Sequence, residues 1–192
     1  KEQIVSKLRE SADLKLKFAK DSISVVEEAA KMLCKSLESG GKILVFGNGG
    51  SAADSQHIAA ELVNRYARKR KALSSLALTT DTSVITSVSN DSSFSNIFSR
   101  QIEALGRKGD VAWAITAGGK SANAIKGLET AQSMGLKTIV FCGQETGKVK
   151  DLADCCVSVP SKSTPRIQEL HITLAHIISE WIEESIVKED DS

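Results

Sequence analysis

KILVFGNGGSAADSQHIAAELVNR, from Lys42 to Arg65, is the stretch of sequence that decides the fold. It opens with an apolar run, residues 43–46, whose β-branched and aromatic members lie between glycines and predict a buried strand. The loop that follows, Gly47 to Ser51, allows the backbone to turn sharply and to approach a ligand closely. A helix predicted over 52–66 begins there, and the N–H groups of its first turn favour an anion such as phosphate. The stretch therefore predicts a strand, a phosphate-binding loop and a helix.

The composition is that of a globular protein with one ordinary domain. The 192 residues are 41% hydrophobic and 26% charged, with a net charge of +1, which gives no electrostatic case for nucleic acid or an anionic membrane surface. The sequence contains no run of about twenty apolar residues, so we expect no segment that spans a membrane and no membrane partner. The four cysteines include no C-x-x-C pair, and the N-terminal residues have no apolar signal core. We therefore expect free thiols and a cytoplasmic location.

Strand-like and helix-like segments alternate after residue 41. Strands are predicted at 43–46, 74–78, 111–116, 137–142 and 155–159. Helices are predicted over 52–66, 82–88, 94–105, 122–134, around 147–153 and over 165–187. The pattern predicts an α/β fold, a three-layer αβα sandwich around a five-stranded parallel sheet that is doubly wound like flavodoxin. We expect residues 1–192 to form a single domain with a core over 41–187 and a frayed tail at 188–192.

Two helices, over 2–18 and 22–38, are predicted before the first strand. They lie outside the alternating part of the chain. Such an appendage packs either against another subunit or against its own sheet, and the sequence pattern leaves both alternatives open.

A second glycine loop, residues 117–121, follows the strand predicted at 111–116. In a parallel sheet both glycine loops lie beyond the C-terminal strand ends, where ligands bind. Thr116 and Ser121 are suited either to helix capping or, with backbone N–H groups, to holding phosphate. Asn90-Asp91 is suited either to a plain turn or to a contact with sugar hydroxyls.

The first loop also matches the dinucleotide fingerprint in the spacing Gly47-x-Gly49-x-x-Ala52. That fingerprint needs an acidic residue about twenty residues further on, at the end of the next strand. The nearest candidate, Asp81, comes about thirty residues on. Nicotinamide binding is therefore the weaker interpretation.

Two helices carry residues with metal-ligand character. His57 and Glu61 are four apart and share a helix face, although a surface pair or a hydrogen-bonded histidine has the same spacing. Gln168 and His176 are eight apart, about 80° round a helix, so they line one side of the terminal helix, whereas His171 faces elsewhere. Together the four offer mixed nitrogen and oxygen ligation suited to Zn²⁺ or a similar ion.

These motifs together resemble the phosphoheptose isomerase family of sugar-isomerase (SIS) domain proteins. The resemblance covers nearly the whole chain in the same order, with the motifs GNGGSAADSQHIAAEL, TTD, ND, TAGGKSAN and RIQELHITLAHI. It implies an αβα-sandwich protomer in a homotetramer, with N-terminal helices used in oligomerisation. It also implies active sites that lie between subunits and bind zinc.

The resemblance further implies which residues act. One Zn²⁺ per subunit would be held by His57, Glu61, Gln168 and His176. Glu61 and His176 would also form the acid–base pair, and which of them takes the proton from carbon is left open. Substrate would contact Asn48, Gly49, Gly50, Ser51, Glu61, Asn90, Asp91, Thr116, Ala117, Gly118, Ser121 and Gln168. The implied reaction converts sedoheptulose 7-phosphate to D-glycero-D-manno-heptose 7-phosphate, the first step toward ADP- or GDP-heptose for lipopolysaccharide core, capsule or S-layer.

One loop departs from the family pattern. Where the family has S-T-S-G-x-S, this chain lacks two hydroxyls, at Ala117 and Gly118, and we predict weaker contact with phosphate. The alternative function is a non-catalytic SIS-domain protein, either a sugar-phosphate-binding regulator or a replication-initiator-binding protein. The initiator-binding relatives lack the carboxylate and the last histidine. Because Glu61 and His176 are both present here, the enzyme is favoured.

Overall fold

The fold is built on a parallel sheet of five strands. The computed structural model describes residues 1–190, with side chains described through residue 186. The strands pair in the order β2-β1-β3-β4-β5, and every pairing is parallel. Their bounds are β1 (Ile43–Gly47), β2 (Ser75–Ala77), β3 (Val111–Ile115), β4 (Lys137–Cys142) and β5 (Cys155–Ser158). All five predicted strands are present, and the predicted α/β class is confirmed.

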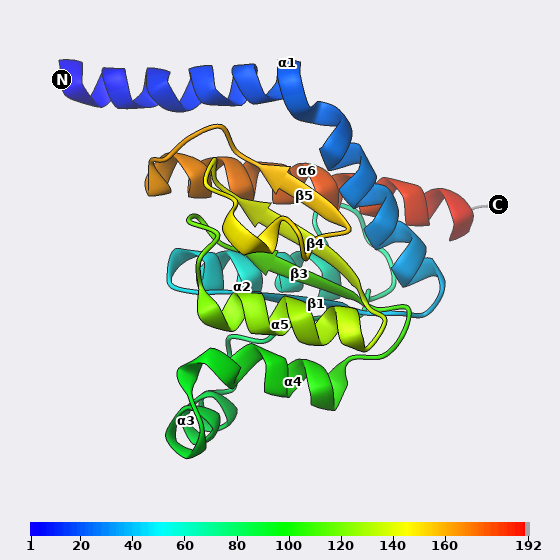
Figure 1. Cartoon of the computed structure of the whole chain (residues 1–192). Coiled ribbons are helices and arrows are strands. Elements are labelled where there is room, and N and C mark those ends of the chain that lie inside the picture. The colour runs from blue at the N-terminus through cyan, green and yellow to red at the C-terminus, as the bar shows by residue number, and fades with distance from the viewer. Residues whose placement is uncertain (191–192) are drawn as a thin grey trace.

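Helices cover both faces of the sheet and complete the three-layer sandwich. The helices are α1 (Glu2–Glu38), α2 (Gly50–Val63), α3 (Thr82–Asp91), α4 (Ile97–Leu105), α5 (Ala122–Ser133) and α6 (Thr164–Asp190), with 3₁₀ turns η1 (Phe94–Asn96) and η2 (Gly147–Val149). In Figure 1, α6 lies above the sheet and α5 and α4 lie below it. The core cluster on the α6 side also contains residues of α1 and α2.

The sheet is buried on both faces, as its parallel topology requires. Successive side chains of a strand point to opposite faces. In β1, Ile43 and Val45 therefore join the cluster under α1, α2 and α6, while Leu44 and Phe46 join the cluster under α4 and α5. All four side chains are fully buried. The short run that predicts the first strand thus contributes side chains to both cores.

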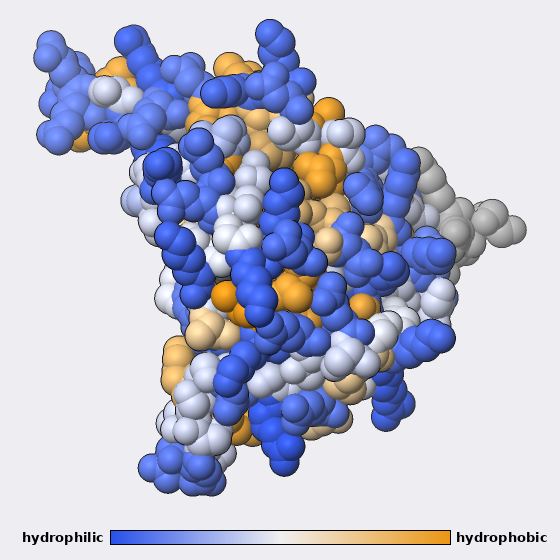
Figure 2. Space-filling model, viewed as in Figure 1, coloured by the Kyte–Doolittle hydropathy of each residue, from blue (hydrophilic) through white to orange (hydrophobic). Residues whose placement is uncertain are grey.

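The N-terminal helices follow the prediction. The pair expected over 2–18 and 22–38 is present as the two parts of α1, which meet at a kink at the non-helical residue Ser22 (φ −143°). Figure 1 shows the bend, and residues 2–21, here called the arm, extend beyond the body of the molecule. The arm is largely hydrophilic with apolar atoms between, as Figure 2 shows, and its exposed apolar residues include Ile4, Leu8 and Leu16.

Three boundaries were predicted wrongly. Helix α3 runs through Asn90-Asp91, which belong to its last turn, and Ser92 is its C-cap. The helix expected around 147–153 is only the short turn η2. Helix α6 continues to Asp190, so most of the predicted frayed tail is helical, and residues 191–192 lie outside the described part of the chain.

Further expectations concern membrane spans and cysteine and histidine side chains. Within the described residues, none of the helices combines the length and apolar character that crossing a bilayer requires. The four cysteines all lie in the described part of the chain and form no disulfide bond there. His171 packs away from the site, as predicted: it is buried, and its Nε2 donates to the carbonyl of Cys142 at 3.2 Å. Burial lowers the pKa of His171 to about 4, so the ring is neutral.

Candidate metal and sugar-phosphate site

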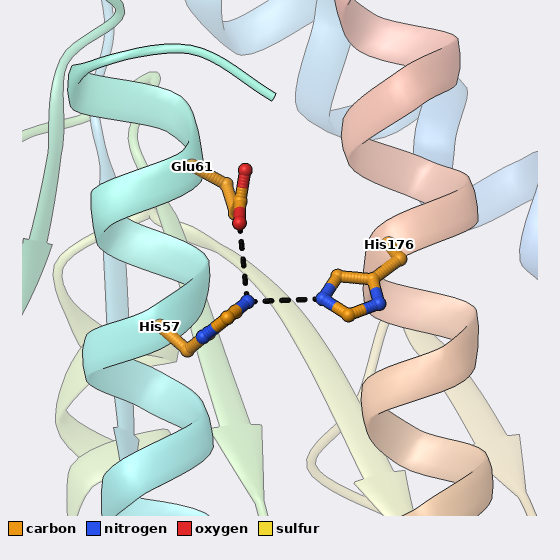
Figure 3. A group of neighbouring side chains, drawn as sticks. All are labelled: His57, Glu61 and His176. Carbon is orange, nitrogen blue, oxygen red and sulfur yellow. Dashed lines mark hydrogen bonds and ion pairs between the residues drawn. The ribbon is translucent and has the colours of Figure 1, made fainter. Parts of the chain in front are cut away.

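Three predicted metal ligands meet between α2 and α6. His57 and Glu61 come from one face of α2, and His176 comes from α6 (Figure 3). His57 Nε2 lies 3.0 Å from His176 Nε2 and 3.1 Å from Glu61 Oε1. The fold therefore brings His57 and His176, which are 119 positions apart in the sequence, within hydrogen-bonding distance of each other.

The geometry and chemistry of this cluster fit a divalent metal ion. The two ring nitrogens and the carboxylate oxygen lie within 4.8 Å of one another. Ligands of a tetrahedral zinc ion, each about 2.1 Å from the metal, are about 3.4 Å apart. Two histidines and one glutamate also form a known catalytic zinc donor set, which leaves a fourth position for water or substrate. The residues present thus fit Zn²⁺.

Asp54 adds negative charge beside this cluster. It lies one turn before His57 on α2, and its Oδ2 is buried without a hydrogen-bond partner among the described residues. Burial raises the pKa of Asp54, while the neighbouring His57 and His176 rings lower it. A buried carboxylate oxygen that lacks a donor further suits a cation nearby. Sequence reasoning missed Asp54, although its spacing of three from His57 was a visible signal.

The cluster opens to the surface and is bordered by an aromatic ring. The His57 side chain is 50% exposed and that of Glu61 is 19% exposed. The ring of Tyr66, which follows α2, has its centroid 5.8 Å from that of His176. A ligand can therefore reach the three residues from solvent, while Tyr66 packs against one side of the imidazole.

The first glycine loop lies at the start of α2, as predicted. Gly49 is the N-cap of α2 and has a φ of 57°, which favours glycine, and a Cβ there would meet open space. The Asn48 side chain exchanges two amide hydrogen bonds with Asn123 of α5, at 2.9 and 2.8 Å. Ser51 is buried in the first turn of the helix. Asn123, which ties the two glycine loops together, was not predicted as a site residue.

The second glycine loop lies at the end of β3. Thr116 is buried, and its hydroxyl is 3.4 Å from that of Ser121. Ser121 precedes α5 but its side chain makes no capping hydrogen bond, so the capping alternative is not observed. The carbonyl of Ala117 accepts a bond from the Gly143 N–H at 3.1 Å, and Gly118 is exposed. The loop is therefore anchored at one end and accessible at the other.

Gln168 is placed with the first glycine loop. A Cβ on Gly50 would lie 2.5 Å from Gln168 Nε2, so the amide packs directly on the start of α2. Gln168 is also two turns of α6 before His176, about 12 Å along the helix axis. The structure thus brings three of the four predicted metal ligands together and sets the fourth beside the loop.

Asn90 and Asp91 are not brought to the cluster within the protomer. They are exposed at the end of α3, and Asn90 Nδ2 donates to Asp91 Oδ1 at 3.0 Å. In Figure 1, α3 lies beside α4 on the side of the sheet opposite α6. Any contact of theirs with the substrate of His57 and His176 would therefore need a neighbouring subunit.

Known proteins match both the sequence and the fold. The SIS domain family model matches residues 8–143. Phosphoheptose isomerase of Aquifex aeolicus is 48% identical, over 96% of this chain and 97% of the relative. That of Thermodesulfovibrio yellowstonii is also 48% identical, over 91% and 87% of the two chains.

A solved structure gives the same result. Phosphoheptose isomerase from Neisseria gonorrhoeae superposes with a TM-score of 0.90 at 38% identity, over 95% of this chain and 98% of that chain. Together these matches favour the enzyme over the regulator and the nicotinamide alternatives. The chain therefore belongs to the phosphoheptose isomerase family of SIS-domain proteins.

Proposed function

We propose that this chain is a phosphoheptose isomerase, an aldose–ketose isomerase that converts sedoheptulose 7-phosphate to D-glycero-D-manno-heptose 7-phosphate. The main support for the proposal is that His57, Glu61 and His176 lie together in this chain. Its relatives are named phosphoheptose isomerase. The carboxylate and imidazoles provide proton transfer, and the adjacent glycine loops suit a phosphate.

The two glycine loops hold the substrate phosphate in this proposal. Exposed Gly49 and Gly50 begin a helix, and backbone N–H groups at a helix start favour an anion. The second loop adds the hydroxyls of Thr116 and Ser121, beside Ala117 and Gly118. Binding energy from the remote phosphate positions the reacting carbons at the cluster. Asn48, Ser51 and Gln168 complete the substrate contacts at this end.

Isomerisation moves a proton between C1 and C2 through an enediol and a second proton between the two oxygens. Glu61 and His176 are the proposed acid–base pair, since a carboxylate and an imidazole exchange protons readily near neutral pH. One oxygen of Glu61 faces His57 while the other points away from it (Figure 3), so the second oxygen is available for proton transfer. The Tyr66 ring packs against the His176 imidazole, with the two ring centroids 5.8 Å apart.

We propose one Zn²⁺ per subunit at this site. His57, Glu61 and His176 would hold the ion, and the role of Gln168 as a fourth ligand stays a prediction. When bound, the ion would polarise the substrate carbonyl and stabilise developing negative charge. The chain's own residues orient the sugar and carry the protons.

We propose a homotetramer with shared active sites. The arm carries exposed Ile4, Leu8 and Leu16, and α6 exposes Ile177 and Trp181, which gives apolar surface for neighbouring subunits. Sharing would also bring Asn90 and Asp91 of one subunit toward the cluster of another. In this proposal the enzyme is a single domain and works in the cytoplasm, toward heptose for lipopolysaccharide, capsule or S-layer.

Metal analysis combined with a turnover assay tests the function. Purified protein should contain about one zinc per chain and convert sedoheptulose 7-phosphate to the aldose, detected by NMR of the product. Other ketose phosphates, such as fructose 6-phosphate, serve as the specificity control. Binding of sugar phosphate without turnover of any substrate would instead support the non-catalytic regulator.

The departure in the second glycine loop predicts a substrate-affinity effect. Restoring the two hydroxyls with Ala117→Thr and Gly118→Ser should lower KM for the sugar phosphate by about 3- to 10-fold, because each hydroxyl adds a hydrogen bond to phosphate. The Gly118 backbone has no positive φ and a side chain there meets open space, so the serine fits. An unchanged KM in the double variant would contradict the prediction that the missing hydroxyls weaken phosphate contact.

A further inference from the structure

A buried ion pair lies near the metal-ligand cluster. Arg70 Nε is 3.1 Å from Glu183 Oε1, and the two side chains are only 1% and 2% exposed. Charges removed this far from water are costly unless hydrogen bonds satisfy them fully. The further partners of both side chains therefore show what the pair does.

Glu183 holds the loop that follows α2. It accepts hydrogen bonds from three successive backbone N–H groups, those of Tyr66 at 3.1 Å and of Ala67 and Arg68 at 2.7 Å each. Burial alone raises the pKa of Glu183, but these bonds and the Arg70 charge together bring the pKa below its usual value. The carboxylate is therefore ionised and fully bonded.

Arg70 holds the end of α2 itself. Its Nη2 donates to the carbonyl of Glu61 at 2.8 Å, and its Nη1 donates to the carbonyls of Leu62 at 3.0 Å and Lys71 at 2.9 Å. Carbonyls of a helix's last turn lack partners within the helix, and a cation there also favours the helix dipole. Arg70 thus caps the turn that carries Glu61.

The pair joins the two helices that form the cluster. Glu183 lies seven residues after His176, so both side chains share one side of α6. Through Arg70 and the 66–68 backbone, Glu183 connects that side of α6 to the C-terminal end of α2. The same bonds fix the backbone of Tyr66, whose ring packs against His176.

We propose that the Arg70–Glu183 pair is a positioning device for the metal centre. It sets the α2–α6 spacing that brings His57, Glu61 and His176 together, and it keeps Tyr66 against His176. Neither residue touches the substrate; each acts through groups that do. The inference rests on the proposed function in treating the three residues as a metal centre. Outer partners of metal ligands typically change metal affinity by about 10- to 100-fold.

A comparison of Glu183→Gln with a matched control tests this proposal. Zn²⁺ affinity is measured by competition with a chromophoric chelator, and kcat and KM are measured at saturating zinc. Glu183→Gln should bind Zn²⁺ about 10- to 100-fold more weakly and show a lower kcat with little change in KM. The unchanged KM is expected because the glycine loops lie at the other end of α2.

Asp110→Asn is the matched control. Asp110 is also a buried carboxylate, with a side chain 4% exposed, and accepts bonds from the Lys42 N–H and ammonium and from the Arg107 N–H. It lies at the start of β3, away from the cluster. Asp110→Asn should lose thermal stability but keep the parent's Zn²⁺ affinity, which separates positioning from general stabilisation.

Tyr66→Leu provides a second variant that leaves both buried charges in place. It keeps the backbone N–H bonded to Glu183 and removes only the ring, and we expect several-fold weaker Zn²⁺ binding. If Glu183→Gln does not fold, the proposal is judged on Tyr66→Leu alone. The proposal is overturned if each of these two variants that folds binds Zn²⁺ as tightly as the parent protein does. It is also overturned if the parent protein binds no Zn²⁺. A parent that binds Zn²⁺ without isomerising the sugar overturns only the proposed function.

Discussion

Glu61→Gln should lower kcat for sedoheptulose 7-phosphate isomerisation by about 10³-fold. An acid–base group typically contributes about 10²- to 10⁴-fold to rate, and a neutral amide neither takes nor gives the proton. Glutamine has the same size as glutamate, and within the described part of the chain the polar contact of the Glu61 carboxylate is with His57, so the fold should persist. Thermal melting and the oligomeric state should therefore match those of the parent.

The loss of a metal ligand has to be separated from the loss of the proton-transfer group. The assay is run across a zinc titration, so that weaker binding appears as a higher zinc requirement and lost chemistry appears as a lower plateau. Glu180→Gln is the control, an exposed glutamate one turn after His176 on α6, and it should keep the parent's kcat. A plateau for Glu61→Gln within threefold of the parent would remove Glu61 from the acid–base pair.

The parts of the site that depend on local sequence were predictable. The apolar run before Gly47 gives β1, and the loop and helix after it follow within a few residues. His57 and Glu61 meet because a four-residue spacing places them on one helix face whatever the rest of the chain does. Such local rules also gave the strand positions and the parallel topology.

Contacts between distant segments were beyond those rules. His176 joins the cluster only because α6 packs beside α2, which no spacing within α6 reveals, and the family resemblance supplied that pairing. The angular argument put Gln168 on the same side as His176, and the rise of about 12 Å along the axis sets its backbone two turns of α6 away. Its amide lies beside Gly50, and its place among the metal ligands stays a prediction.

The Arg70–Glu183 pair was invisible for a related reason. Glu183 lies in a charged segment near the end of α6, a pattern typical of a solvent-exposed helix end. Its partner, Arg70, is 113 residues away in the sequence. The bend of α1 at Ser22, by contrast, was predicted, as the break between the helices expected over 2–18 and 22–38. The ion pair depends on a tertiary contact between α6 and the segment after α2, which local rules do not reveal.

The second glycine loop offers the other large effect, at Gly119. This residue has a φ of 63°, and a Cβ there would lie 2.2 Å from the Thr146 carbonyl oxygen and 2.5 Å from its carbon. Both clashing atoms are backbone, so relief requires one of the two loops to move. We expect Gly119→Ala to lower the free energy of unfolding by about 2–4 kcal/mol, measured by urea denaturation.

The same displacement should impair substrate binding. Thr116 and Ser121 flank Gly119, and a shift of about 1 Å in a positioning group can cost about 100-fold in rate. We therefore expect KM for the sugar phosphate to rise by about tenfold or more. Gly118→Ala is the adjacent control, because its Cβ meets nothing within 4 Å and its φ is not positive. It should change the unfolding free energy by less than about 0.5 kcal/mol. Equal effects of the two alanines on stability and KM would mean that the contact between Gly119 and Thr146 does not set the shape of the phosphate loop.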